Sequence, residues 1–136
     1  MIIVITGGNG FLGSNLAKKF LTKGHKVYIF DKSKNKFSLI NKNAHQVNCD
    51  LTNYKTLEKL KINKVDLILH CAGQPSAALS FKDPELDLKV NILGTLNILR
   101  WAKTKNVKKI LFASTFNVYE ENNFKPKLSE NDNCKA

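Results

Sequence analysis

The sequence predicts an α/β fold in which helices cover both faces of a doubly wound parallel sheet. Two observations lead to this class. Short apolar runs alternate with segments of helical periodicity from residue 2 to residue 115, which is typical of successive βαβ units. The runs are apolar at nearly every position, as in parallel strands that are buried on both faces.

In the first half of the chain, the run IIVI at residues 2–5 predicts a buried first strand. Apolar residues then recur every four positions, which predicts a helix over residues 11–23 that Gly24 ends. The remaining elements of this half are a second strand at 26–30 (KVYIF), a polar loop at 31–45 and a third strand at 46–50 (QVNCD).

In the second half, Asn53 is expected to cap a short helix in the segment NYKTLEKL. Pro84 is expected to begin a long helix that runs to about Lys105. Its apolar residues cover more than one stripe, so we expect burial on two sides, against the sheet and against another helix or chain. The other elements are a fourth strand at 65–70 (VDLILH), a loop at 71–83, a fifth strand at 108–115 (KKILFAST) and a polar tail from residue 120.

Length and composition fit one soluble domain over residues 1–136, with 43% hydrophobic and 24% charged residues. No run approaches the roughly 18 apolar residues of a membrane span. The N-terminal segment MIIVITGG has no basic region before its apolar run, so we do not expect a signal peptide. These observations predict a cytoplasmic protein that does not bind membranes.

The net charge of +11 suggests a nucleic-acid-binding surface at first sight. However, every one of the 22 basic residues except Arg100 is a lysine, and the lysines are spread along the chain. We therefore expect a solvated lysine surface and no nucleic-acid partner. The three cysteines, Cys49, Cys71 and Cys134, are widely spaced without a CxxC pair, which predicts neither a disulfide nor a metal site.

The glycines that follow the first strand have the spacing of a dinucleotide-binding turn. Gly8, Gly10 and Gly13 satisfy G-x-G-x-x-G, and Gly7, Gly10 and Gly13 satisfy a closely related pattern. In such a turn the first glycines allow a tight bend, Gly10 admits a pyrophosphate close to the backbone, and Gly13 lets the helix pack on the strand. Because a strand precedes the turn and a helix follows it, the pattern predicts a Rossmann-type fold.

Asp31 stands at the end of the second strand, where such folds place an acid. A carboxylate at this point accepts hydrogen bonds from the adenosine ribose and repels a 2′-phosphate, so it favours NAD over NADP. The alternative is an ordinary loop aspartate. Lys32 and Lys34 lie nearby and could serve a 2′-phosphate, although lysine is frequent throughout the chain.

Six parts of the sequence carry a resemblance to a known family, namely TGGNGFLGSNL (6–16), Asp31, CDLTN (49–53), HCAGQ (70–74), NILGTLNIL (91–99) and FASTFNVYE (112–120). Through them the sequence resembles the extended short-chain dehydrogenases, namely the NAD-dependent epimerase/dehydratase family of UDP-glucose 4-epimerase type. The resemblance covers essentially the whole chain and corresponds to the N-terminal part of a full-length member. It implies strand order 3-2-1-4-5 and a chain that stops before the later strands and the substrate domain.

The resemblance implies roles for individual residues along an NAD molecule. Asp31 would hold the adenosine ribose, and Asp50 and Leu51 would contact the adenine. Asn91 would lie close to the cofactor at the centre of the sheet. From the residues alone, Asp50, His70 and Asn91 could equally be loop or capping residues. The residues along the pyrophosphate would be Gly7, Gly10, Phe11 and Leu12, and those near the ribose and phosphates would be Cys71, Ala72 and Gly73.

The same resemblance assigns the substrate-binding hydroxyl to Thr115, with Ser114 beside it in a supporting role. Both hydroxyls could instead merely end a strand. The family's catalytic base is the tyrosine of a Tyr-x-x-x-Lys pair on the next helix, and we expect this pair to be absent from the chain. It would lie a few residues beyond Ala136.

Two functional classes therefore remain open. In the first, the chain is the NAD-binding part of a nucleotide-sugar epimerase or dehydratase and is inactive alone, with a nucleotide-sugar substrate only in the complete enzyme. In the second, it is a non-catalytic nucleotide-binding or partner-binding module. The resemblance also implies a homodimer through the helix at 84–105, and no metal is expected.

Overall fold

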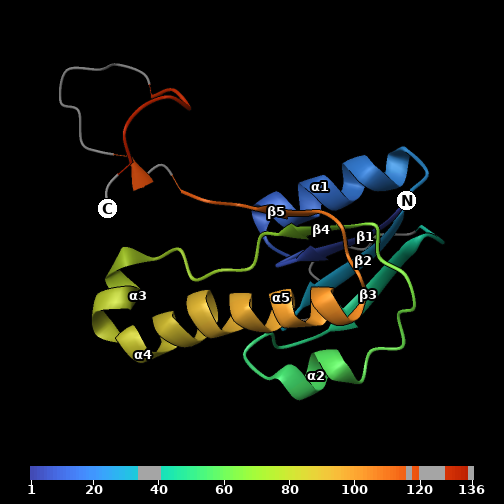
Figure 1. Cartoon of the computed structure of the whole chain (residues 1–136), viewed down its shortest axis with the longest axis horizontal. Coiled ribbons are helices and arrows are strands. Elements are labelled where there is room, and N and C mark those ends of the chain that lie inside the picture. The colour runs from blue at the N-terminus through green and yellow to red at the C-terminus, as the bar shows by residue number, and fades with distance from the viewer. Residues whose placement is uncertain (34–40, 116–117, 120–127, 135–136) are drawn as a thin grey trace.

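The computed structural model of the protein describes residues 1–33, 41–115, 118–119 and 128–134 (Figure 1). Within these ranges the sheet has five strands in the order β3-β2-β1-β4-β5, and every pairing between them is parallel. This confirms the predicted fold class and strand order. The strands are Ile2–Thr6 (β1), Lys26–Asp31 (β2), Ala44–Asn48 (β3), Leu67–His70 (β4) and Ile110–Phe112 (β5).

Helices cover both faces of the sheet, with α1 on one face and α2 and α5 on the other (Figure 1). Alternate residues of β1 pack into the two layers, because Ile3 and Ile5 contact the α1 side while Val4 faces Ile98 and Trp101 of α5. The helical segments are Phe11–Thr22 (α1), Tyr54–Glu58 (α2), Ala77–Lys82 (α3), Pro84–Asp87 (α4), Leu88–Leu93 (η1, a π-helix) and Gly94–Thr104 (α5).

The helix boundaries follow the local sequence signals. Gly24 has a φ of +77° just after α1, a conformation that glycine adopts without strain. Asn53 caps α2 as predicted, since its side chain accepts a hydrogen bond from the backbone nitrogen of Lys55 at 3.1 Å. Asp83 caps α4 in the same way, with Pro84 in the first turn.

Several predictions about elements need correction. The fourth strand begins at Leu67, two residues later than expected. The third strand is Ala44–Asn48, two residues earlier than expected, and the fifth is only Ile110–Phe112. The segment 71–83 is not entirely loop, because it contains the helix α3. The side chain of Ser76 caps this helix by accepting a hydrogen bond from the backbone nitrogen of Leu79, and Pro75 precedes the helix and so does not interrupt it. The predicted long helix contains the π-helical stretch η1.

The long helical segment from Pro84 to Thr104 is apolar on two sides, as predicted, but the described residues cover only one of them. Ile98, Trp101 and Ala102 are buried against the sheet. Apolar side chains on the other side remain exposed, namely Leu88, Ile92, Leu96 and Leu99. In the tail, Tyr119 forms an isolated antiparallel bridge with Cys134, which the polar sequence did not predict; Glu120 and the loop residues 34–40 lie outside the described part of the chain.

Candidate functional site

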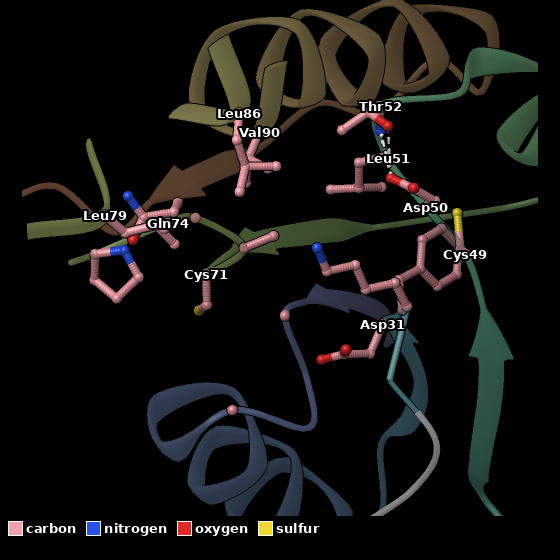
Figure 2. Close-up of a pocket in the computed structure, with 17 residues that line it drawn as sticks. Asp31, Cys49, Asp50, Leu51, Thr52, Cys71, Gln74, Leu79, Leu86 and Val90 are labelled. Atoms are coloured by element: carbon pink, nitrogen blue, oxygen red, sulfur yellow. Dashed lines mark hydrogen bonds between the residues drawn. The ribbon is translucent and has the colours of Figure 1, made fainter. Parts of the chain in front are cut away.

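A pocket of about 430 Å³ opens at the edge of the sheet where β1, β2 and β4 end (Figure 2). This volume lies in the range of small-molecule sites, and such crevices at the carboxyl ends of parallel strands are where open α/β sheets bind ligands. The pocket is lined by Gly7, Gly10, Phe30, Asp31, Lys32, Cys49, Asp50, Leu51, Thr52, Cys71, Ala72, Gly73, Gln74, Pro75, Leu79, Leu86 and Val90.

The glycine turn forms one wall of the pocket. Gly7 has a φ of +63°, and a Cβ on it would lie 2.8 Å from both the nitrogen and the Cα of Ala72, so only glycine fits. Gly10 donates its N–H to the Gly7 carbonyl at 3.0 Å and precedes α1, whose start has no side-chain cap. The first N–H groups of α1 therefore remain available to an anion.

Gly13 does not line the pocket. It is buried on the first turn of α1, where a Cβ would collide with the backbone of Gly7 and Gly8. Its role is the close packing of helix on strand, as its position in the motif predicts. Phe11 and Leu12 do not line the pocket either, and Phe11 is 88% exposed.

Asp31 reaches the pocket from the end of β2 and is held in place by the glycine turn (Figure 2). One carboxylate oxygen accepts the backbone N–H of Asn9 at 2.9 Å, and the other accepts the N–H and hydroxyl of Ser33 at 2.9 and 2.8 Å. The side chain of Asn9 in turn donates to the Ser33 carbonyl at 3.0 Å and accepts from Gln46 at 3.2 Å. Sequence reasoning missed Asn9, whose position inside the glycine turn was its only signal.

Asp50, Leu51 and Thr52 follow β3 and form another wall. Asp50 accepts the backbone N–H and the hydroxyl of Thr52 at 2.9 and 2.8 Å. The Leu51 carbonyl accepts the side-chain amide of Asn97 from α5 at 2.8 Å, which ties this loop to the helix layer. Asp50 and Leu51 therefore both line the pocket as the resemblance implied.

Cys71, Ala72 and Gly73 leave β4 and line the pocket as well. Burial raises the pKa of the Cys71 thiol, and burial likewise raises that of Cys49. Both thiols are thus kept protonated near neutral pH and are poor nucleophiles. They act here as small apolar parts of the wall.

Asn91 does not line the pocket, although it was expected beside the cofactor. Its side chain instead clamps a pocket residue, accepting from the Gln74 N–H at 2.7 Å and donating to the Gln74 carbonyl at 3.2 Å. Gln74 is the last residue of the segment HCAGQ, and no role was assigned to it from the sequence. The opposite wall carries Leu79 of α3 and Leu86 and Val90 of α4 and η1, which point toward the cavity (Figure 2).

His70 is not at the pocket surface. It is only 2% exposed and lies between Thr6 of β1 and Thr95 of α5. Desolvation lowers its pKa, so the neutral imidazole is favoured.

Ser114 and Thr115 are exposed beyond the end of β5 and do not line the pocket. The spacing Tyr-x-x-x-Lys does occur in the chain, at Tyr28 and Lys32, so the expectation that it is absent was wrong as a statement about sequence. Tyr28 lies on the strand β2, where residues four apart are about 13 Å from each other, and its ring stacks on His45. This pair therefore cannot form the helical catalytic arrangement.

Within the described ranges, no three residues among His, Cys, Asp and Glu are grouped so that they could hold a metal ion. None of the helices found in these ranges has the length and apolar character needed to cross a membrane.

Comparison with known proteins agrees with this geometry. The model of the NAD dependent epimerase/dehydratase family matches residues 3–135. UDP-glucuronic acid decarboxylase 1 from Xenopus tropicalis is 38% identical over 132 residues, which cover 94% of this chain and 30% of the relative.

Two solved structures are similar over 99% of the chain. The UDP-glucose 4-epimerase of Thermus thermophilus, in complex with NAD, is 29% identical with a TM-score of 0.84, and the chain covers 44% of it. The UDP-glucose 4-epimerase from Bifidobacterium longum, in complex with NAD+ and UDP, is 26% identical with a TM-score of 0.87, and the chain covers 43% of it. The chain thus spans less than half the length of these similar proteins.

Proposed function

The chain belongs to the NAD-dependent epimerase/dehydratase family, and we propose that it forms the NAD-binding portion of a nucleotide-sugar epimerase or dehydratase. The observation that carries this proposal is the convergence of the glycine turn, the Asp31 carboxylate and the segment after β4 on one pocket. The glycine turn, Asp31 and the segment after β4 each follow a different strand. The turn suits contacts with the phosphates, the Asp31 carboxylate suits contacts with the ribose, and the segment after β4 offers backbone contacts.

The pocket has space where the pyrophosphate is expected. A Cβ on Gly10 would make one tight contact, with the Gly7 carbonyl oxygen at 3.2 Å, and would meet no other atom within 4 Å, so the rest of the region in front of Gly10 is open. We place the pyrophosphate against Gly7 and Gly10 and the first turn of α1. Because the side chains of Phe11 and Leu12 do not line the pocket, their contribution is assigned to their backbone N–H groups, which have no partner within the helix.

The adenosine end is assigned to the walls formed by Asp31, Asp50 and Leu51. Asp31 is fixed by its hydrogen bonds to Asn9 and Ser33, so its negative charge stays at the pocket. This charge supports NAD over NADP, because a 2′-phosphate would meet it directly. Lys32 also lines the pocket, and its positive charge would favour the 2′-phosphate of NADP. Substitution of Asp31 therefore tests which of the two charges decides the preference.

In the complete enzyme, NAD would supply the oxidant for a sugar hydroxyl. Thr115, with Ser114 beside it, is assigned to hydrogen bonding with the sugar. Both residues lie at the carboxyl end of β5, the same edge of the sheet as the pocket. A nucleotide sugar is proposed as substrate because several similar proteins act on or bind compounds of that class.

A second candidate is a non-catalytic nucleotide-binding module. It is favoured by one observation: within the described residues, no histidine or tyrosine lines the pocket, so neither of these side chains can serve there as a general base. This candidate shares the cofactor site and differs only in the absence of turnover.

Calorimetric titration of the purified chain with NAD tests the site itself. Gly10→Val places a branched side chain in the open region in front of the turn, in a backbone conformation (φ −74°, ψ 174°) that any residue adopts. We expect this variant to remain folded and to lose NAD binding. Thr104→Val is the control and should bind NAD normally, since Thr104 lies at the C-terminal end of α5 and does not line the pocket. Normal binding by Gly10→Val would contradict the placement.

A further inference from the structure

A closed circuit of hydrogen bonds surrounds the segment 72–74, whose residues all line the pocket. On one side, Ala72 donates its backbone N–H to Thr6 Oγ1 at 3.2 Å, and that oxygen lies 2.7 Å from Nδ1 of His70. On the other side, Nε2 of His70 lies 3.0 Å from Thr95 Oγ1, which donates to the Asn91 carbonyl at 2.6 Å. The side chain of Asn91 closes the circuit on the backbone of Gln74.

The donor and acceptor of every bond between Ala72 and the Asn91 carbonyl follow from these two backbone groups, because the Ala72 N–H can only donate and the Asn91 carbonyl can only accept. The Asn91 carbonyl can only accept, so the hydroxyl hydrogen of Thr95 is used there. Thr95 must then accept from His70, and Nε2 of His70 must carry the proton. In a neutral ring Nδ1 is consequently an acceptor, and it takes the hydroxyl hydrogen of Thr6, whose oxygen in turn accepts from Ala72.

The circuit is shielded from solvent at its centre. Thr6 has no exposed surface, His70 is 2% exposed, and the ring of Phe112 lies 5.5 Å from the imidazole centroid. Water cannot readily replace a lost partner at such a site, so a broken bond leaves a buried polar group unpaired. These hydrogen bonds are therefore expected to hold Ala72 and Gln74, the two ends of segment 72–74, firmly in place.

The position of Ala72 matters because the glycine turn packs directly on it. The backbone of Gly7 lies so close to Cys71 and Ala72 that a Cβ on Gly7 would stand 2.8 Å from the Cys71 carbonyl oxygen. A shift of Ala72 would change the contact between two adjoining walls of the pocket, the glycine turn and the segment after β4. The clamp of Asn91 on Gln74 holds the far end of the same segment.

We propose that His70, as the neutral tautomer protonated on Nε2, is a positioning residue of the nucleotide pocket, and that it sets the place of segment 72–74 through Thr6 on one side and Thr95 and Asn91 on the other. His70 touches no ligand in this arrangement and acts only through these partners. The effect on NAD affinity rests on the proposed function, whereas the tautomer and the position of the segment do not.

The first experiment reads the tautomer without any ligand. Long-range nitrogen–proton NMR correlation on the unmodified chain, at a pH about one unit above the ordinary histidine pKa, distinguishes a proton on Nε2 from one on Nδ1. We expect the Nε2 form for His70. A proton on Nδ1, or a doubly protonated ring at this pH, would overturn the assigned direction of the circuit and with it the proposal.

The second experiment breaks the circuit at a residue that does not line the pocket. Thr95→Val removes both of the threonine's hydrogen bonds, while Thr95→Ser keeps the hydroxyl. The lost bonds only position the segment and do not touch NAD, so we expect a loss in binding free energy of about one hydrogen bond. NAD should therefore bind about three- to tenfold more weakly to Thr95→Val and about normally to Thr95→Ser. The amide resonances of Ala72 and Gln74 should shift in the valine variant only.

Thr104→Val is the matched control, because Thr104 lies on the same helix and donates to the Trp101 carbonyl at 2.8 Å, outside the circuit. It should leave NAD affinity and both amide resonances unchanged. Equal NAD affinities for Thr95→Val and Thr104→Val, with unmoved amides, would refute the positioning role. If the unmodified chain fails to bind NAD, the proposed function fails, while the amide shifts still decide whether the circuit positions segment 72–74.

Discussion

The backbone N–H of Asn9 donates to the carboxylate of Asp31 at 2.9 Å, which ties the glycine turn after β1 to the end of β2. The two residues are 22 positions apart in the sequence, and of the two only Asp31 lines the pocket. The bond holds the carboxylate at the place where a dinucleotide's adenosine ribose is expected, and it keeps the negative charge of Asp31 close to the turn.

We therefore predict that Asp31→Ala weakens NAD binding and reduces the preference for NAD over NADP. Calorimetric titration with both cofactors measures the two quantities. Asp66→Ala is a matched control, since Asp66 also accepts a strand N–H, from Ile2 at 2.7 Å, but does not line the pocket. Equal binding of both cofactors by the unmodified chain would contradict the role given to Asp31.

Gly13→Ala should destabilise the fold, because the added Cβ collides with the backbone of Gly7 and Gly8 rather than with a flexible side chain. Overpacking of this kind costs about 1–3 kcal/mol in the free energy of unfolding. Gly94→Ala provides the contrast: its Cβ would make an ordinary contact of 3.5 Å with Leu51, and alanine favours the helix by about 0.5–1 kcal/mol. Urea unfolding of both variants checks the prediction, which fails if Gly13→Ala is as stable as the unmodified chain.

Stability should fall as the pH is lowered below about 6.5. Burial lowers the pKa of His70 in the folded chain from the ordinary value of 6.5, so between that value and the folded pKa the unfolded chain binds the extra proton. The contribution is thus fully present above 6.5 and is lost as the pH falls toward the folded pKa. Urea unfolding curves measured between about pH 7.5 and about pH 5 record this loss of stability.

His70→Gln should flatten this pH dependence. His45 is the necessary control, because burial and the neighbouring Lys26 also lower its pKa, although it lies on β3 at the other side of the sheet. His45→Gln should leave most of the dependence in place. If it removes as much of the slope as His70→Gln does, the slope does not come from the buried histidine.

The exposed apolar side of the long helical segment should cause self-association at micromolar concentration. Leu88, Ile92, Leu96 and Leu99 are each roughly half exposed or more and follow one another along the segment. The double variant Ile92→Lys/Leu96→Lys should be monomeric by sedimentation. Phe81→Lys is the control, since Phe81 is 91% exposed but lies on α3. An unmodified chain that stays monomeric at high concentration would refute the prediction.

The chain alone should show no epimerase or dehydratase turnover with NAD and UDP-glucose. Thr115 cannot act as a base near neutral pH, and His70, the histidine at the carboxyl edge of the sheet, is buried in its hydrogen bonds to Thr6 and Thr95. General-base catalysis typically contributes about 10²–10⁴-fold, so its absence is measurable. NADH absorbance and sugar analysis provide the readouts. Product above a no-protein control that Thr115→Val abolishes would show that the catalytic group is misplaced.

The sequence by itself determined the parts that depend on short-range patterns. The first strand, the glycine turn and α1 follow from apolar periodicity and from backbone conformations that only glycine adopts, and Asn53 caps its helix as its side chain predicts. The alternation of strands and helices led directly to the parallel sheet, because few arrangements bury such strands on both faces. Asp31 was found from its place at the end of the second strand, whereas Asp50, Leu51 and the segment after β4 were assigned through the family resemblance.

Only the tertiary structure decided what each polar residue contacts at that edge. His70 meets Thr6, which is 64 positions away, and it is buried by helices and strands that no local pattern brings together. Asn91 turned out to hold Gln74 rather than to line the pocket, and Asn9 to hold Asp31 and Ser33. Hydrogen-bond partners are set by distance and direction after the sheet has formed, whereas periodicity and turn chemistry act between neighbours in the chain, so the sequence placed residues at the site but not in their roles.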